Sequence, residues 1–296
     1  MSKIARDLCS NVIDLILDNL APPFDCAVRN GPIHMGRRAG RNGQDHPYRD
    51  IEAASQVWER WGQCALKHSE LWAYIAIPGT CYPLMMEGEP WWTRARELMQ
   101  RSENQPLVVC IDLRFVGDDD QCRIIEECLP RIKKLCLHNS DLSSDNPILE
   151  VLKRTRAPCM EKFSLDMEHT SRRVICDFKP GDLFYNDTPA LRWLTVKPGI
   201  RAVSPSALSF LTRYTVLYRV GERTDDYDLH AELSLMKSLE VLEIEIDSQE
   251  KLDWENREEI HLERLKKIVI RGSLENCEQF LSKMRVAEDF WVEYPE

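Results

Sequence analysis

The chain has 296 residues, 43% of them apolar, and a formal net charge of −10 with a pI near 5.3, which disfavours general binding to nucleic acid or anionic membranes. No run of about 18 apolar residues is present, and the start Met1-Ser2-Lys3 leads into no apolar signal segment. We therefore expect a cytoplasmic or nuclear protein without a membrane span, whose eleven cysteines, free of any Cys-x-x-Cys pair, stay reduced.

Two amphipathic helices are predicted near the N-terminus. Apolar residues from Leu8 to Leu20 form one broad face, and Pro22-Pro23 ends this helix. Segment 21–50 is rich in Gly and Arg and poor in apolar residues, so it predicts a mobile insertion. A helical pattern resumes at Ile51 and runs to about Lys67, with Trp58 among its apolar positions.

A turn and an apolar anchor follow these helices, in Ser69-Glu70-Leu71-Trp72-Ala73-Tyr74-Ile75. With the Val57–Trp61 stretch, this arrangement resembles an F-box, the three-helix module by which receptor subunits dock on a Skp-family adaptor of a cullin–RING ubiquitin ligase. The sequel, with Trp91-Trp92 and Gln105-Pro106-Leu107, is similar to fungal F-box proteins that carry degenerate leucine-rich repeats. The resemblance implies an F-box-like module over 1–77, a linking helix over 78–105 and a repeat solenoid over 106–296.

The resemblance also implies partners: a Skp-family adaptor with its cullin complex, and a protein substrate whose identity it does not give. The residues that it assigns to adaptor binding are Leu8, Val12, Leu15, Ile16 and Trp58. The opening departs from the family pattern, because Leu8 is followed by Cys9 where the family usually has proline, and Asn11 stands at the acidic position. The lost proline is one that would preset the first helical turn.

Six later segments share one grid of apolar residues, apolar-x-x-apolar-x-apolar. Their first positions are Ile132, Met160, Leu191, Leu211, Leu239 and Leu265, with steps of 20 to 31 residues. A period of this size is typical of leucine-rich repeats, in which stacked units share one core. Ahead of them, Leu107–Leu113 predicts a strand buried on both faces.

The predicted fold class is therefore α/β: a short N-terminal helical F-box-like module followed by an irregular leucine-rich-repeat solenoid with a curved parallel sheet. The solenoid is predicted to be irregular because no asparagine recurs three positions after the last strand anchor.

Helix starts between the strands are predicted from capping residues. Asn146-Pro147 precedes an apolar run, and Ser204-Pro205 precedes a helix expected over Ser206–Leu211. Ser273 is predicted to cap a helix with a core-facing stripe, formed by Leu274, Cys277, Phe280, Leu281 and Met284.

Strand alternation places a second set of side chains on the concave face, where six Lys or Arg stand against three Asp or Glu. The candidate substrate-binding residues are Lys134, His138, Lys162, Trp193, Lys197, Arg213, Lys267 and Arg271. Trp193 with its cationic neighbours is the best candidate for an interaction hot spot. The alternative is a solvated sheet whose charges form cross-strand ion pairs.

Motifs for catalysis or metal binding are absent from the sequence: there is no Gly-x-Ser-x-Gly, His-Glu-x-x-His or Gly-x-Gly-x-x-Gly. Asp118-Asp119-Asp120 fits an acidic turn better than a calcium loop. We expect no enzyme, cofactor or metal. The leading hypothesis is an F-box substrate receptor; the alternatives are a non-ubiquitin interaction scaffold whose F-box-like helices cap the solenoid, and a sensor that holds a small polyanion in the basic concavity.

Overall fold

The computed structural model describes residues 69–77, 91–112, 119–139, 147–167, 183–196, 203–217, 229–245, 257–287 and 289–294. They belong to two compact units, one that ends at Phe115 and one that runs from Val116 to Glu296. The two predicted N-terminal helices and the 21–50 insertion lie outside the described residues.

The described residues of the first unit form a short parallel strand pair, one α-helix and one 3-10 helix. A 3-10 helix η1 (Ser69–Trp72) leads into β1 (Tyr74–Ile77); α5 (Trp91–Arg101) then leads into β2 (Leu107–Asp112). Strands β1 and β2 pair in parallel, with Ile75 opposite Val109. Each residue from Leu107 to Ile111 is at most 4% exposed, so the strand predicted to be buried on both faces is confirmed over this stretch. Helix α5 lies within segment 78–105, where the linking helix was expected, whereas β1 was not predicted.

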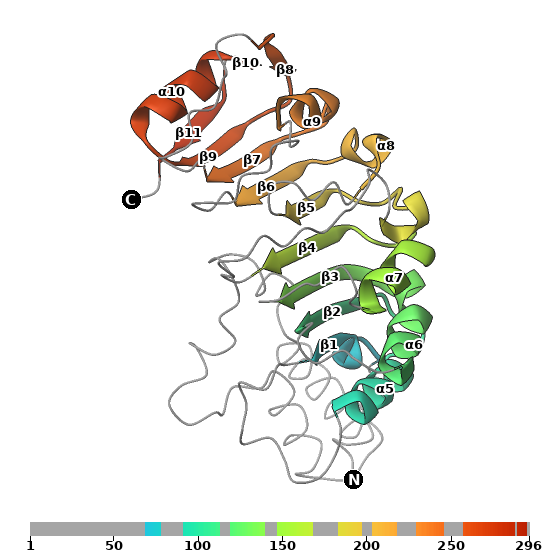
Figure 1. Ribbon diagram of the computed structural model, residues 1–296. Coiled ribbons are helices and arrows are strands. Elements are labelled where there is room, and N and C mark those ends of the chain that lie inside the picture. Colours follow the sequence, from blue (N-terminus) through green and yellow to red (C-terminus); the bar gives the residue numbers. More distant parts are fainter. Residues whose placement is uncertain are drawn as a thin grey trace, which may run out of the picture. The chain divides into compact units, whose positions relative to one another are not determined.

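The described residues of the second unit include seven strands that pair in parallel in one sheet. They are, in sheet order, β3 (Ile132–Asn139), β4 (Lys162–Met167), β5 (Trp193–Val196), β6 (Arg213–Leu217), β7 (Val241–Glu245), β9 (Lys267–Arg271) and β11 (Trp291–Glu293). A separate parallel pair joins β8 (Ile260–Leu262) to β10 (Met284–Val286). The predicted α/β class with a parallel sheet is confirmed (Figure 1).

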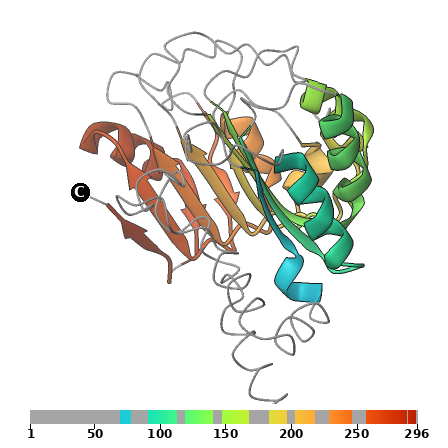
Figure 2. The same cartoon turned by 90° about the horizontal axis from the view of Figure 1, so that it is seen from below.

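Helices connect these strands. They are α6 (Asp119–Cys128), α7 (Pro147–Arg154), α8 (Pro205–Leu208), α9 (Leu229–Leu235) and α10 (Leu274–Ser282), with the 3-10 helices η3 (Leu129–Arg131) and η4 (Leu183–Asn186). Helices α6, α7, α8 and α9 lie along the same side of the sheet (Figures 1 and 2). Asp119 and Asp120, predicted to form an acidic turn, instead make the first turn of α6, where carboxylates favour the helix dipole.

The apolar grid of the sequence is the core of this unit. Every one of its eighteen positions is at most 2% exposed. The pairing register aligns the grid from strand to strand: Leu194 lies opposite Phe163 on one side and Tyr214 on the other. Even the one polar group on this face is satisfied, because the Tyr214 hydroxyl donates to Glu232 of α9 at 2.7 Å. Shared burial of the grid therefore fixes the register.

The strands begin at a repeated backbone junction. The carbonyl of Glu161 accepts hydrogen bonds from the N–H groups of Arg192 (2.9 Å) and Trp193 (3.0 Å). The same double acceptance recurs at the carbonyls of Arg192, Thr212 and Glu240. At these four junctions, the residue that follows the first grid position of one segment accepts the hydrogen bonds that start the next strand.

The predicted helix starts agree with the structure, although one helix is shorter than expected. Helix α7 begins at Pro147, and the Ser204 hydroxyl accepts from the N–H of Ala207 at 3.2 Å. Helix α8 ends at Leu208 and not at Leu211, because Leu211 turns into the core as the first grid residue of β6 and is fully buried.

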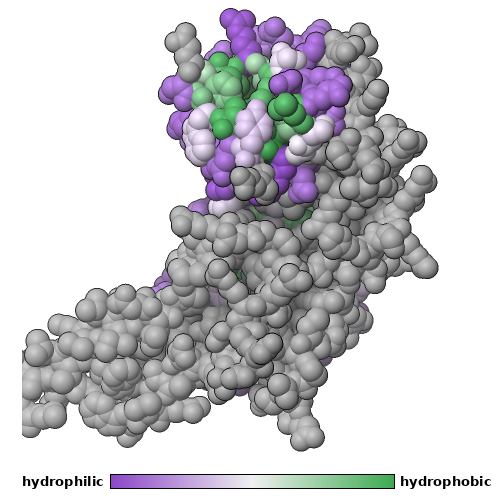
Figure 3. All heavy atoms as spheres, turned by 90° about the vertical axis from the view of Figure 1, so that its left-hand side faces the viewer, coloured by the Kyte–Doolittle hydropathy of each residue, from purple (hydrophilic) through white to green (hydrophobic). Residues whose placement is uncertain are grey.

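The C-terminal end differs most from prediction. Ser273 caps α10 as expected, and Cys277 and Phe280 are buried, but Leu274 is 67% exposed. Leu274 occupies the first position of the helix, where its side chain projects from the unit. Trp291 and Tyr294 are also more than half exposed, and Figure 3 shows apolar residues among polar ones at this end.

Candidate protein-interaction face

The side chains that alternate with the buried grid form the outer face of the sheet in the second unit. The strand register places seven of them in one line across the strands. This basic row consists of Lys134, Lys162, Trp193, Arg213, Val241, Lys267 and Trp291. It holds four cations, two tryptophans, one valine and no carboxylate.

Trp193 stands between two cations at the centre of the row. The Lys162 ammonium lies 3.3 Å from the centre of its ring, and the Arg213 guanidinium lies 4.2 Å from it. Because Lys162 and Arg213 come from the two strands that flank β5, they approach the indole from opposite sides. Cations over an aromatic face are stabilised by the negative potential of the ring, so the three side chains hold one another in place.

A similar contact ends the row. Lys267 lies over the ring of Trp291 at 4.2 Å and pairs with Glu293 at 2.6 Å. In the neighbouring line of the sheet, Glu243 forms an ion pair with Arg213. Two of the four cations are thus anchored by carboxylates at the side of the row, and the row itself stays cationic.

Polar atoms at the centre of the face are covered yet lack hydrogen-bond partners. Among the described residues, the indole N–H of Trp193, the hydroxyl of Thr195 and the Nε of Arg213 are buried without a partner. Buried polar groups are nearly always satisfied in stable proteins. Three such atoms on neighbouring strands mark this part of the outer face as polar and incompletely satisfied.

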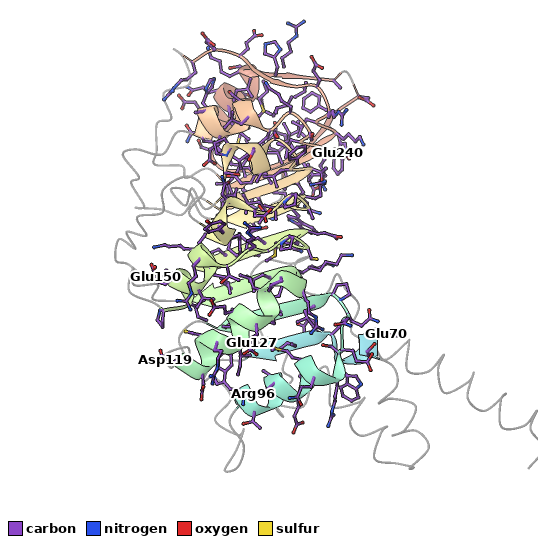
Figure 4. The ribbon with its side chains drawn as sticks, turned by 90° about the vertical axis from the view of Figure 1, so that its right-hand side faces the viewer. Glu70, Arg96, Asp119, Glu127, Glu150 and Glu240 are labelled. Atoms are coloured by element: carbon purple, nitrogen blue, oxygen red, sulfur yellow. The ribbon has the colours of Figure 1, made fainter. Side chains whose placement is uncertain are left out.

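The net charge of helix α6 is opposite to that of the row. Helix α6 carries four carboxylates and a single arginine, and Figure 4 shows Asp119, Glu127 and Glu150 on helices α6 and α7. Arg154 of α7 donates two hydrogen bonds to Glu126 of α6, at 3.1 and 2.8 Å, and so neutralises one of these carboxylates. The second unit therefore separates an acidic helix from a basic line on its sheet.

The structure brings together five of the eight residues predicted on this face, namely Lys134, Lys162, Trp193, Arg213 and Lys267. Arg271 lies on the same face but opposite Glu245, outside the row, and is exposed. His138 lies in β3 opposite Asp166. Lys197 is outside the described residues, as are the five predicted adaptor-binding residues, Leu8, Val12, Leu15, Ile16 and Trp58.

Trp291 and Glu293 are the functional candidates that the sequence pattern missed. The grid would place its first anchor at Asp289, so strand β11 does not show the apolar pattern. The only signal was the alternation in Trp291-Val292-Glu293, which is a weak one for a strand of three residues.

The described cysteines offer no activated nucleophile. Burial raises the pKa of the Cys128 thiol from 9.0 to about 12, which disfavours the reactive thiolate. Burial also raises the pKa of Cys277. Cys159 is exposed, and five others, Cys110, Cys122, Cys128, Cys136 and Cys277, are buried as small apolar groups.

The first unit holds the described residues of segment 1–77, which begin at Ser69. Trp72 is 1% exposed, and the guanidinium of Arg101 on α5 lies 4.9 Å from the centre of its ring. The amide of Gln105 donates to the Ser69 hydroxyl at 3.2 Å. The turn at Ser69–Trp72 is therefore packed against the helix that comes after it in the chain.

Taken over the described residues, no three His, Cys, Asp or Glu side chains converge on a possible metal site. No helix of that part of the chain has the length and apolar character needed to cross a membrane. The basic row is the candidate site because its cations and tryptophans are the side chains used for binding. Searches with the sequence against family models and against curated proteins give no match.

Proposed function

We propose that this chain is the substrate-recognition subunit of a Skp–cullin–F-box ubiquitin ligase, with an irregular leucine-rich-repeat solenoid that binds a protein substrate. The N-terminal helices would hold the Skp-family adaptor, and the outer face of the sheet would hold the substrate. The chain would transfer nothing itself, because the chemistry of such a ligase lies in its other subunits.

The observation that carries this proposal is the outer face of the sheet. Strands that share a buried grid present a second, polar face whose residues are not needed for the core. On that face Trp193 is held rigidly by Lys162 and Arg213. Tryptophan and arginine dominate the energetics of protein interfaces, and a side chain that is already ordered loses little entropy on binding.

The F-box part of the proposal is supported by the first unit and by the resemblance in the sequence. An F-box closes on an apolar anchor after a turn, and Trp72 and Ile75 are buried in the corresponding places, at 1% and 2% exposure. Both η1, which holds Trp72, and β1, which holds Ile75, contact α5, and this fits a module that is joined firmly to the next elements of the chain.

Co-purification with a Skp-family adaptor tests the proposal. The full chain should bind the adaptor at micromolar concentration, and replacing Leu15 and Ile16 by Ser should abolish binding, because an F-box presents apolar residues of its first helix to the adaptor. The melting transition of the repeats should stay unchanged. Leu235→Asp, at the exposed last residue of α9, is the control and should bind the adaptor as the parent does.

The alternative is a non-ubiquitin scaffold in which the same helices cap the solenoid core. The departures at Cys9 and Asn11 favour it, since they alter the opening of the first helix. In that case the parent protein binds no adaptor, and the double substitution lowers the melting temperature because it exposes the end of the core. Absence of adaptor binding by the parent would end the ligase proposal.

A further inference from the structure

The basic row differs in charge from the rest of the molecule. It contains Lys134, Lys162, Arg213 and Lys267 and no carboxylate, whereas the chain as a whole carries a net charge of −10. The net charge of −10 disfavours anionic ligands in general, whereas the four cations of the row attract them. A local field of this kind selects and orients a negatively charged partner.

The contacts of Trp193 narrow the chemistry of that partner. Both faces of the indole are occupied by cations, Lys162 at 3.3 Å and Arg213 at 4.2 Å. A nucleic-acid base or a methylated ammonium group needs a free aromatic face on which to stack. Those ligands are therefore disfavoured at Trp193, and the ligand that fits there is one that interacts with the cations themselves, through carboxylates.

The length of the row indicates an extended peptide. Neighbouring strands lie about 4.8 Å apart, so the six steps from Lys134 to Trp291 span about 29 Å. An extended chain rises about 3.3 Å per residue, so about nine residues cover this distance. A single carboxylate or a small anion would use only one part of the row.

The two ends of the row differ in chemistry, because Trp291 is aromatic and Lys134 is cationic. The Trp291 side chain is 52% exposed on the outermost strand of the sheet. An apolar residue of the ligand would bury exposed aromatic surface at the Trp291 end, while carboxylates lie over the cations.

We propose that the basic row binds an extended acidic segment of the partner protein, about nine residues long, with an apolar residue at the Trp291 end. This inference rests on the proposed function in that it names the kind of substrate segment recognised. The segment would run across the strands, with carboxylates over Lys134, Arg213 and Lys267. Lys162 would act mainly by holding Trp193, because it is only 7% exposed.

Binding of a labelled nonapeptide to the full chain, followed by fluorescence anisotropy, tests the proposal. The probe alternates Glu with Ser and ends in Leu; its control has Gln in place of Glu. The Glu peptide should bind and weaken as salt is raised, and the Gln peptide should bind at least tenfold more weakly. Equal binding of the two peptides would overturn the proposal.

Two substitutions locate the site. Val241→Asp places a carboxylate between Arg213 and Lys267 and should weaken binding at least tenfold. Leu235→Asp makes the same change in charge on the exposed end of α9 and should leave affinity within twofold. Glu243→Gln removes the carboxylate that pairs with Arg213 and should tighten binding about threefold. Equal affinity of all three variants for the Glu peptide would overturn the assignment to this row.

Two further measurements distinguish this proposal from a small-anion site and from the ligase proposal. If inorganic tripolyphosphate binds the chain more tightly than the Glu peptide does, the row is a small-anion site and the proposal fails. Adaptor binding is measured on the same preparations. Adaptor binding without peptide binding would retain the ligase proposal and refute this one, while peptide binding without adaptor binding would refute only the ligase proposal.

Discussion

The two faces of the sheet in the second unit come from the same strands but differ in burial and in side-chain chemistry. On the inner face, all eighteen grid residues are at most 2% exposed and, apart from Tyr214, have apolar side chains. On the outer face, successive positions of the basic row are Lys, Lys, Trp, Arg, Val, Lys and Trp. Burial requires the inner residues to be apolar, whereas the residues of the basic row can be apolar, aromatic or charged.

Residues on the inner face stabilise the fold, whereas residues on the outer face are available for recognition. An inner residue such as Phe163 contacts the core through the whole side chain, including the edge-to-face contact with Phe184 at 5.0 Å. An outer residue such as Arg213 is one-third exposed and bound by one carboxylate and one ring. Substitutions at partly exposed outer positions such as Arg213 should therefore change binding with little effect on folding.

Adjacent residues of β7 give the strongest test of this separation. Leu242→Asp should lower the free energy of unfolding by at least about 5 kcal/mol, because it loses a fully buried side chain and buries an unpaired carboxylate. Val241→Asp, on the other face between two cations, should cost about 1 kcal/mol or less. Urea unfolding of the two variants measures the difference, and similar losses would mean that the faces are not independent.

The buried thiol of Cys128, at the end of α6, should make the free energy of unfolding depend on pH. Cys128 has an ordinary pKa of 9.0 when unfolded and about 12 when folded. Between these values the unfolded chain has lost a proton that the folded chain keeps, so stability is fully present below pH 9 and falls as pH rises towards 12. The contribution is about 1.4 kcal/mol per pH unit.

Urea unfolding from pH 8 to pH 10.5 measures this slope. In Cys128→Ala the loss of stability with pH should be correspondingly shallower, while Cys159→Ala, at an exposed thiol, should keep the slope of the parent protein. Equal slopes in all three proteins would show that Cys128 is not shielded from solvent.

The smallest expected effect is on the outer face. Glu243→Gln removes the ion pair with Arg213, and both side chains are partly exposed. The loss of stability should therefore be below about 1 kcal/mol, as for other partly exposed pairs. Thermal melts at low and high salt check this; a loss as large as that of an inner residue would make the outer face part of the core.

The sequence predicted the inner face well because burial repeats at fixed spacing. The grid identified β3, β4, β5, β6, β7 and β9, with the correct register, from apolar residues alone. It could not identify β11, since a strand with a neighbour on only one side has less need of apolar anchors: Val292 is half-buried and Tyr294 exposed. Strands β8 and β10 have three residues each, too few for a periodic signal.

The outer face could be predicted only in part. Alternation placed Lys162, Trp193 and Arg213 side by side, because side chains on parallel strands in register must be neighbours. It could not predict that both cations turn onto the indole or that Arg213 also pairs with Glu243, since long side chains choose among many rotamers. Nor could it predict that the row ends at Trp291, because the last strand itself was missed.

The order of the strands across the sheet has a consequence for how the second unit folds. Apart from β8 and β10, the strands follow one another in space as they do along the chain. Parallel pairing is slow where it joins distant segments, but here each pairing closes a loop of one repeat. Folding can begin at any neighbouring pair and spread outward, as in other linear arrays. Since doubling a loop adds only about 0.6 kcal/mol to its closure, repeats of unequal length can be accommodated without changing the register of the sheet.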